Sequence, residues 1–189
     1  IRILRGSGLK GLVSLDKKSK IENKNLLRPL LNQKKENLVF LTKKIFNFYI
    51  KDPSNNDEKY QRIKIRKLIK ELEVNGFNKR KLNKTIKSLK NSNTIVDFYV
   101  EKNLEKNSFF FKKTNKLILN KSFFKQPQEV KFRSLTDSIK LVGKKHYSAR
   151  GKKIERIINQ IENDKFFRVT LGGCIIEKVN QTVIISKEH

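Results

Sequence analysis

The stretch FRVTLGGCIIEKVNQTVIIS, residues 167–186, decides how the carboxy-terminal part of the chain folds. Two apolar segments, 166–171 and 174–179, flank the pair Gly172-Gly173. Such a pair is typical of a two-residue hairpin turn, because glycine adopts positive φ without strain. A third apolar segment, TVIIS, ends the quoted stretch after a short polar break. The pattern predicts two antiparallel strands joined by the glycine turn, with a third strand paired beside them.

Two amphipathic segments come before these strands. Residues 130–142 and 150–162 each carry apolar side chains at the i, i+3, i+4 and i+7 spacing of one helix face. The side chains expected to point inward are Phe132, Leu135, Ile139 and Val142, and then Ile154, Ile157, Ile158 and Ile161. Further upstream, FFFKKTNKLIL at 109–119 predicts two short strands around a Thr114-Asn115 turn. The carboxy-terminal region is therefore expected to be a small α+β unit.

The first half of the chain is predicted to be largely helical. Helices are expected at 34–49, 58–74 and 79–92, the last of them resuming over 99–104. The apolar faces of the first two consist of Leu38, Leu41, Thr42 and Ile45, and of Ile65, Leu68, Ile69 and Leu72. The break at 75–78 is the expected domain boundary.

The segments outside these helices are predicted to be irregular or extended. Residues 1–5 have the pattern of a last helical turn that Gly6 ends. A charged loop is expected from there to about Asn25. LLRPLL at 26–31 predicts an extended apolar segment, and Asn32 is the expected N-cap of the next helix.

The charge balance points to a polyanionic partner. The 189 residues carry 45 Lys and Arg against 18 Asp and Glu, a formal net charge of +27, while 37% of them are hydrophobic. Such an excess opposes compaction and attracts polyanions, of which nucleic acid is the commonest. An alternative for part of the charge is an AT-rich genome, which favours Lys, Asn, Ile and Phe codons. That bias does not readily account for the scarcity of Glu, so RNA or DNA is the expected partner class.

Composition also excludes several classes. One cysteine, Cys174, cannot form an internal disulfide, and two histidines, His146 and His189, cannot complete a usual zinc site. No apolar run approaches the length of a bilayer span and no signal-peptide pattern is present, so a cytoplasmic protein with no membrane contact is expected. Because the chain has no methionine and starts at Ile1, we expect its amino terminus not to be the natural one.

A glycine-rich loop, RGSGLKGL at 5–12, is the first candidate for chemistry. Its backbone N–H groups could approach an anion while Arg5 supplies positive charge. It matches neither the Walker loop nor the Rossmann fingerprint. The alternative is an ordinary helix stop followed by a flexible loop.

A polar turn, DPSNND at 52–57, is the second candidate. Asp52 and Asn55 would present a carboxylate and an amide on a rigid turn, which suits an amino group or a ribose hydroxyl. The alternative is an Asx turn that only caps the next helix.

Arg62 and Arg66 are the third candidate. They stand one helical turn apart, a geometry that can hold neighbouring phosphates. The alternative is a solvated basic face.

Phe109, Phe110 and Phe111, flanked by lysines, are a fourth candidate, as a platform on which bases stack. The alternative is that two of the three belong to the core. Cys174 is expected to be a small buried residue, because no histidine base lies near it. No Ser-His-Asp arrangement, paired-carboxylate site or metal site can be argued from the sequence.

Taken in order, RILRGSGLKGL, LLRPLL, the following helix, KDPSNND and YQRIKIR resemble the second half of the catalytic domain of the tRNA(Ile)-lysidine synthetase family. The closing stretches RSLTDSIKLVGKKHYSARGKKIERII and FRVTLGGCIIEKVNQTVIISKE resemble the tail of that family in alphaproteobacteria. The resemblance implies a mixed α/β fold: residues 1–74 as the rear part of a Rossmann-like PP-loop ATPase domain, and 75–189 as a helical and α+β region that binds tRNA.

The resemblance also implies an activity. Such enzymes use ATP and Mg²⁺ to adenylylate carbon 2 of the wobble cytidine in a CAU-anticodon isoleucine tRNA, and the ε-amine of L-lysine then displaces AMP to give lysidine. The family's SGGxDS and HxxDD motifs are absent from residues 1–189. The chain is therefore expected to be truncated upstream and inactive alone. Homodimers occur in the family, and nothing in the sequence requires one.

By motif, Arg5 falls at a catalytic position, and Gly6, Ser7, Gly8, Asp52 and Asn55 fall in the nucleotide and substrate cleft of the family. Arg62 and Arg66 fall where the family faces tRNA. The family usually has Asn where this chain has Ile63. The function left open beside the ligase is a non-catalytic basic RNA-binding module, and a DNA-binding regulator is disfavoured because no helix-turn-helix is evident.

Overall fold

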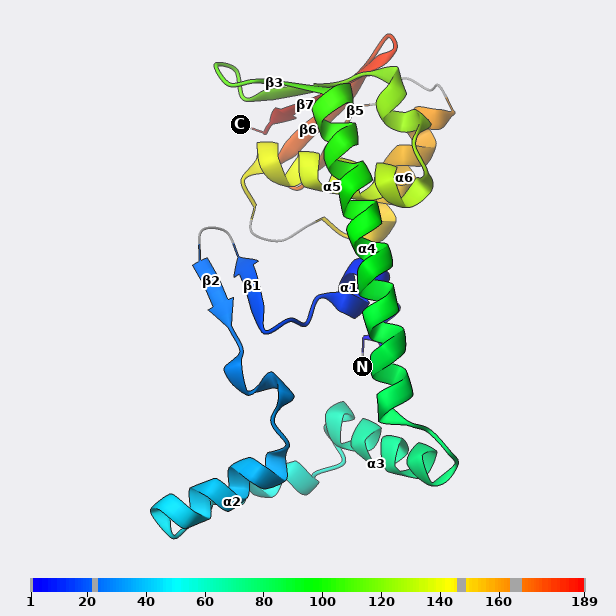
Figure 1. The fold of residues 1–189 in the computed structure, drawn as a ribbon. Coiled ribbons are helices and arrows are strands. Elements are labelled where there is room, and N and C mark those ends of the chain that lie inside the picture. Colours follow the sequence, from blue (N-terminus) through cyan, green and yellow to red (C-terminus); the bar gives the residue numbers. More distant parts are fainter. Residues whose placement is uncertain (1, 22–23, 146–148, 164–167, 189) are drawn as a thin grey trace. The chain divides into compact units, whose positions relative to one another are not determined.

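The computed structural model describes residues 2–21, 24–145, 149–163 and 168–188, which form two compact units, Ile1–Asn93 and Thr94–His189. The described residues contain six α-helices and two antiparallel sheets (Figure 1), which confirms the mixed α and β class. No described helix, not even the long lysine-rich one that spans the unit boundary, has the length and hydropathy of a membrane span.

The first unit is built from short elements around few buried side chains. Its elements are η1 (Ile3–Arg5), α1 (Leu9–Val13), β1 (Lys18–Ile21), β2 (Lys24–Leu27), η2 (Pro29–Asn32), α2 (Lys35–Phe46), η3 (Pro53–Asn56), α3 (Gln61–Val74) and the first half of α4 (Lys79–Asn107). The three helices predicted here all form, and Gly6 ends η1 in the left-handed conformation as expected.

The prediction of a loop as far as Asn25 is wrong. The segment contains α1 and the hairpin β1–β2, in which Lys18 pairs with Leu27 and Ile21 with Lys24. The strand sequences KSKI and KNLL do not alternate apolar and polar residues, so no strand pattern marks them. Arg28 instead secures the hairpin, because its Nη1 donates to the Asp16 carbonyl at 3.0 Å and to Ser19 Oγ at 2.9 Å.

Two expectations about helix ends also need correction. The N-cap of α2 is Lys34, because η2 continues through Asn32 and delays the start of the helix. The third helix does not break and resume but runs unbroken from Lys79 to Asn107, since no Gly or Pro interrupts it. The side chain of Asn78 caps it by accepting from the N–H groups of Arg80 and Lys81.

The predicted apolar faces of α2 and α3 are only partly buried. No described side chain of α2 is buried, and Ile45 is 59% exposed. In α3 the buried residue is Ile63, whereas Leu68 and Leu72 are 47% and 42% exposed. The periodicity therefore located the helices correctly but not the side chains that they bury.

The second unit is an antiparallel sheet covered by helices. It contains the rest of α4, then β3 (Ser108–Phe111), β4 (Lys116–Leu119), η4 (Lys121–Lys125), α5 (Gln128–Gly143), α6 (Gly151–Glu162), β5 (Arg168–Leu171), β6 (Cys174–Val179) and β7 (Thr182–Lys187). The strand order is β3-β4-β7-β6-β5. The predicted helices, hairpin and three closing strands are all confirmed, although residues 166–167 of the predicted first closing strand lie outside the described residues.

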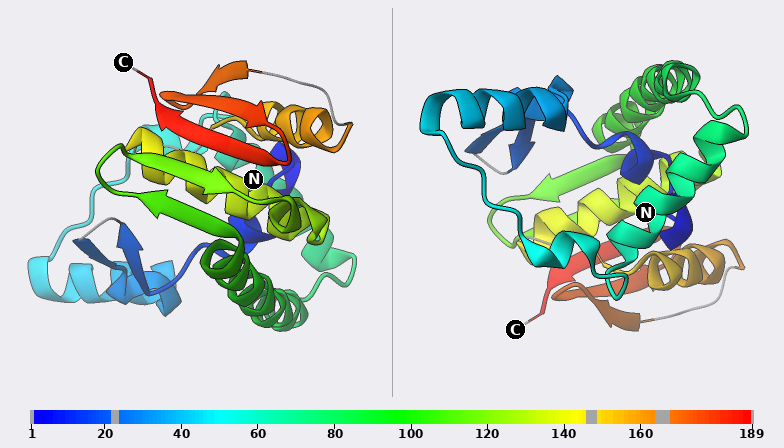
Figure 2. Two further views of the ribbon diagram at one scale, coloured as in Figure 1. Left: turned by 90° about the horizontal axis from the view of Figure 1, so that it is seen from above. Right: turned by 90° about the horizontal axis from the view of Figure 1, so that it is seen from below.

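One face of this sheet carries the core. Alternate residues of β4, β6 and β7 are buried beneath α5, and α6 packs against α5. The left view of Figure 2 shows the strands in front of α5. Fully buried side chains of this core include Leu119, Phe123, Leu135, Ile154, Ile158, Ile176 and Ile185. The core confirms the inward faces predicted for both helices, except that Phe132 is partly exposed.

A buried arginine joins α4 to α5. The guanidinium of Arg133 is 3% exposed and forms ion pairs with Asp97 at 2.9 Å and Glu129 at 2.7 Å. Losing one partner of such a buried charge is costly. The contact therefore fixes how the carboxy-terminal half of α4 packs on the sheet domain.

Cys174 is buried as predicted, and its thiol donates to the Ile139 carbonyl at 3.3 Å. Burial, with a smaller contribution from Glu188, raises the pKa of this thiol from 9.0 to about 11. We expect it to resist thiol reagents at pH 8 until the protein unfolds. Because the folded pKa is the higher one, its contribution to stability is complete below pH 9 and is lost as the pH rises towards 11. Urea unfolding of the native chain and of Cys174→Ala across this range checks the prediction, since only the native chain should show this part of the decline.

Candidate functional site

The glycine loop is a tight turn that uses its own backbone donors. Gly6, at φ +65°, donates its N–H to the Ile3 carbonyl, and the N–H of Ser7 donates to the Arg2 carbonyl. These two N–H groups are therefore already occupied. A β-carbon at Gly6 or Gly8 would meet nothing within 4 Å, so one side of the loop is open. What the loop offers an anion is chiefly the exposed Arg5, which has no side-chain hydrogen bond or ion pair to the described residues.

Arg2 holds this loop, and the sequence analysis did not single it out. Its Nη1 donates to the Gly11 carbonyl and to Ser14 Oγ, both at 2.5 Å, which ties η1 to the end of α1. Gly11 is required there, because a β-carbon on it would lie 2.9 Å from the β-carbon of Ser7. Arg2 lies nine residues from Gly11, whose carbonyl accepts its hydrogen bond, and no short sequence motif predicts such a contact.

The turn at 52–57 is built around Asp52. The carboxylate accepts from the N–H of Ser54 at 2.9 Å, and Asn55 Nδ2 donates to the Asp52 carbonyl at 3.2 Å. The hydrogen bond from Ser54 lowers the pKa of Asp52 below its ordinary value. Both side chains are exposed and make these hydrogen bonds within the turn, as a local cap does. A carboxylate that stays ionised on the surface also suits an ammonium ligand.

Arg62 and Arg66 both lie exposed on α3. Among the described residues neither forms an ion pair, whereas the neighbouring Lys67 pairs with Glu58. Ile63, where the resemblance leads one to expect Asn, is buried beside them. An apolar side chain at this point anchors the helix and leaves the two guanidinium groups free to meet solvent or phosphate.

The structure does not join the three sets of predicted residues by direct contact. In the described part of the chain no hydrogen bond or ion pair links Arg5–Gly8 with Asp52, Asn55, Arg62 or Arg66. Each set is held by its own element.

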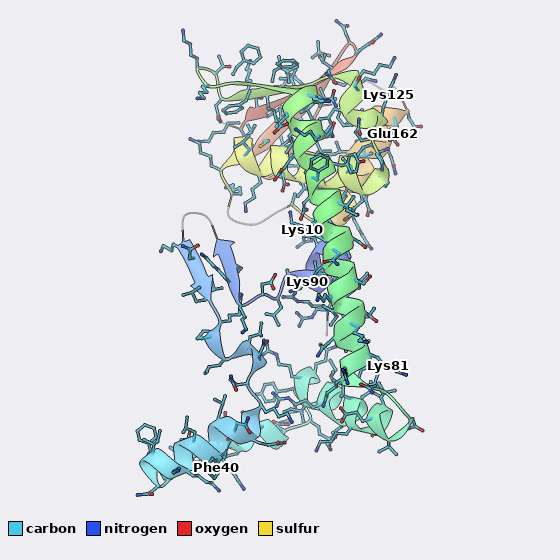
Figure 3. The ribbon with its side chains drawn as sticks, viewed as in Figure 1. Lys10, Phe40, Lys81, Lys90, Lys125 and Glu162 are labelled. Atoms are coloured by element: carbon cyan, nitrogen blue, oxygen red, sulfur yellow. The ribbon has the colours of Figure 1, made fainter. Side chains whose placement is uncertain are left out.

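A cavity of about 1100 Å³ lies elsewhere in the first unit. Its walls carry a basic group, Arg2, Lys17, Lys34, Lys79 and Lys90, against a single acid, Asp16. Lys90 on α4, labelled in Figure 3, donates to Asp16 Oδ1 at 2.5 Å over a separation of 74 residues. This cluster could not be read from local patterns, because its members are far apart in sequence.

The described residues contain no group of three or more His, Cys, Asp or Glu side chains that could hold a metal ion. We therefore assign no Mg²⁺ ligands within them. The exposed Arg5 guanidinium, beside the open side of the glycine loop, is a positive charge available to an anion.

Comparison with known proteins shows what these elements are similar to. Residues 1–72 match the model of a family described as a PP-loop domain. These residues are therefore similar to a PP-loop domain.

The whole chain also aligns with tRNA(Ile)-lysidine synthases. It is 30% identical to that of Wolbachia sp. subsp. Brugia malayi (strain TRS), 29% to that of Wolbachia pipientis wMel and 30% to that of Orientia tsutsugamushi (strain Boryong). Each alignment covers all of this chain and 44% of the relative. The chain is thus homologous over its full length to tRNA(Ile)-lysidine synthases and spans less than half the length of those relatives. The resemblance stated from the motifs is confirmed.

Proposed function

We propose that this chain is part of an ATP-dependent ligase that joins lysine to carbon 2 of the wobble cytidine in a CAU-anticodon tRNA(Ile). The observation that carries the proposal is the homology to tRNA(Ile)-lysidine synthases over the entire chain, together with the PP-loop match. A net charge of +27 supports it, since tRNA is a polyanion. In this reaction the cytidine oxygen attacks the α-phosphate of ATP with loss of pyrophosphate, and the lysine ε-amine then displaces AMP from carbon 2.

Within that reaction we assign roles to the exposed groups of the first unit. Arg5 would balance negative charge on the nucleotide, beside the open turn of Gly6, Ser7 and Gly8. Asp52, kept ionised by its hydrogen bond from Ser54, would pair with an ammonium group of lysine, and Asn55 would hold the turn in place.

We further propose that residues 1–74 act as the rear of the catalytic domain and that 75–189 contact tRNA. The PP-loop match, which ends at residue 72, supports the first part. The boundary between the compact units, at residues 93 and 94, comes later in the sequence than the proposed boundary at residues 74 and 75. The helix α4 runs through residues 93 and 94 without a break. The lysines along α4 would meet phosphates, which fix register and read little sequence.

The test is lysidine formation with ATP, labelled lysine and a CAU-anticodon isoleucine tRNA. It compares this chain with a longer form that carries the SGGxDS and HxxDD motifs, which residues 1–189 lack. We expect activity from the longer form alone, because the chain lacks the phosphate loop of the family. Activity from residues 1–189 would contradict the proposed inactivity, and silence from both would contradict the ligase.

In the longer form, Arg62→Ala with Arg66→Ala is expected to weaken tRNA binding about tenfold and to reduce the slope of log K against log salt by about 2, as the loss of two phosphate contacts should. Fluorescence anisotropy over a salt series measures both quantities. Lys67→Ala is the matched control, since that lysine is already paired with Glu58. An unchanged affinity and slope would show that the two arginines form only a solvated face.

The second candidate function is a non-catalytic RNA-binding module. It is favoured by the net charge and by the core that the second unit has of its own. Binding of tRNA by the longer form without any lysidine formation would select it.

A further inference from the structure

One face of the five-stranded sheet carries exposed aromatic side chains and lies opposite the face that holds the core. In β4 the side chains of Leu117 and Leu119 are 2% and 0% exposed, whereas Ile118 between them points to the opposite face. Helices α5 and α6 cover the Leu117 side. Among the described residues of the second unit, no helix packs on the face that carries Ile118 (Figure 2).

Strand register shows which side chains share this face. Phe109 pairs with Ile118, Ile118 with Ile184, and Ile184 with Glu177. Phe111 pairs with Lys116 in the next row on the same face. Because residues i and i+2 of a strand point the same way, the two phenylalanines stand side by side on the edge strand β3, about 6.8 Å apart along it.

Both rings are accessible. Phe109 is 58% exposed and Phe111 is 52% exposed. Phe110 points to the other face, in the row of Leu117 and Ile185. The alternative in which two of the three rings belong to the core is therefore not what the structure shows. Leaving two large rings half in water costs hydrophobic stabilisation, which a stacking partner would restore.

The charge around these rings favours an anionic partner. From Lys106 to Lys125 the chain has six lysines and no acid. Lys112 and Lys113 follow Phe111 directly, and Lys116 lies opposite it. The acid on this face, Glu177, lies three strands away and is 3.8 Å from the guanidinium of Arg168.

We propose that the open sheet face stacks unpaired RNA bases on Phe109 and Phe111 while Lys112, Lys113 and Lys116 meet the flanking phosphates. Aromatic side chains on an exposed antiparallel sheet, with cations beside them, are the arrangement that holds single-stranded nucleotides with little sequence preference. The inference rests on the proposed function in that the occupant is RNA. It assigns to this surface the single-stranded nucleotides of the substrate.

The test uses the full chain and a labelled single-stranded RNA of mixed sequence, with anisotropy as the readout. Phe109→Leu with Phe111→Leu keeps the apolar volume but removes the aromatic rings. Phe110→Leu, on the opposite face of the same strand, is the matched control. We expect about tenfold weaker binding for the double variant and no change for the control. The salt slope should stay constant, because the phosphate contacts remain.

Two further ligands separate stacking from charge. A strand of equal length with abasic sites keeps the phosphates but has no bases, and a duplex keeps its bases paired. We expect the double variant and the native chain to bind the abasic strand with equal affinity, and likewise the duplex. The proposal would be overturned if the double variant lost as much affinity for the abasic strand as for the mixed-sequence strand. It would also be overturned if the double variant lost no affinity for the mixed-sequence strand.

A second measurement does not depend on removing the rings. The chain has no tryptophan, so Phe111→Trp introduces a single indole. Its emission should be quenched by the mixed-sequence strand and not by the abasic one, while Phe110→Trp should respond to neither. Unchanged Phe111→Trp emission at saturating RNA would reject stacking. Lysidine formation is measured separately, so a failure of the ligase proposal and a failure of this one give different results.

Discussion

Replacing Gly143 with alanine is expected to lower the free energy of unfolding of the second unit by about 3 kcal/mol, near the upper end for overpacking in a close-packed site. A β-carbon on Gly143 would lie 2.2 Å from the carbonyl oxygen of Gly172 and 3.0 Å from Cys174 Sγ. The closest atom is backbone, in a two-glycine turn between β5 and β6, so no side chain can rotate away. Relief would require α5 to move off the sheet.

The measurement is urea unfolding followed by circular dichroism, in which the midpoint should fall while the slope stays constant. Gly151→Ala is the matched control. Its β-carbon would lie 3.5 Å from the Phe132 ring, an ordinary contact, and alanine is the better helix former. It should be neutral or stabilising. If Gly143→Ala behaved in the same way, the close approach of α5 to the turn would not be a constraint on the fold.

The same turn shows why the second unit could be predicted from sequence. Gly172 and Gly173 adopt φ of +65° and +77°, a conformation that few other residues tolerate. A Gly-Gly pair in the sequence therefore predicts the turn. The helices α5 and α6 bury the faces that their spacing indicates, because each has a sheet or helix to pack against within the same hundred residues. Local signals and tertiary packing agree here.

The first unit departs from its sequence signals for a physical reason. Spacing identifies the apolar side of α2, but burial depends on the surface that meets it, and no described side chain of α2 is fully buried. In α3, likewise, the buried side chain is Ile63, which is not on the predicted face, whereas Leu72 of that face is 42% exposed. The hairpin β1–β2 was not predicted because no apolar pattern marks its strands. It is held by backbone pairing and by the hydrogen bonds of Arg28.

The candidate site was predictable only as separate pieces. The turn at Asp52 and the arginine pair on α3 were located from composition and helical spacing, and the structure gives each a defined geometry. Arg2 and the Lys90–Asp16 pair were not, since a contact over many residues carries no local signature. Side-chain hydrogen bonds at such range are a consequence of the fold.

Replacing Asn103 with alanine is expected to lower the free energy of unfolding of the second unit by about 2–3 kcal/mol. Asn103 is 2% exposed on α4, and its Nδ2 donates to the Phe123 carbonyl at 3.3 Å and to Ser134 Oγ at 3.1 Å. Its Oδ1 accepts from Asn107 at 2.8 Å. Removing the amide leaves buried polar groups of η4 and α5 without this partner, and these cannot reach water.

Asn83→Ala, an exposed position on the same helix, is the control and should be neutral or slightly stabilising. Asn103→Leu separates packing from hydrogen bonding, because leucine fills the volume but donates nothing. We expect Leu and Ala to be similarly destabilising. A double-mutant cycle with Ser134→Ala should give a coupling of about 1 kcal/mol, the value of one buried hydrogen bond. Native stability in Asn103→Leu would show that the site requires only a side chain of this volume. A coupling of zero would show that the contact with Ser134 does not help to hold α4 to α5.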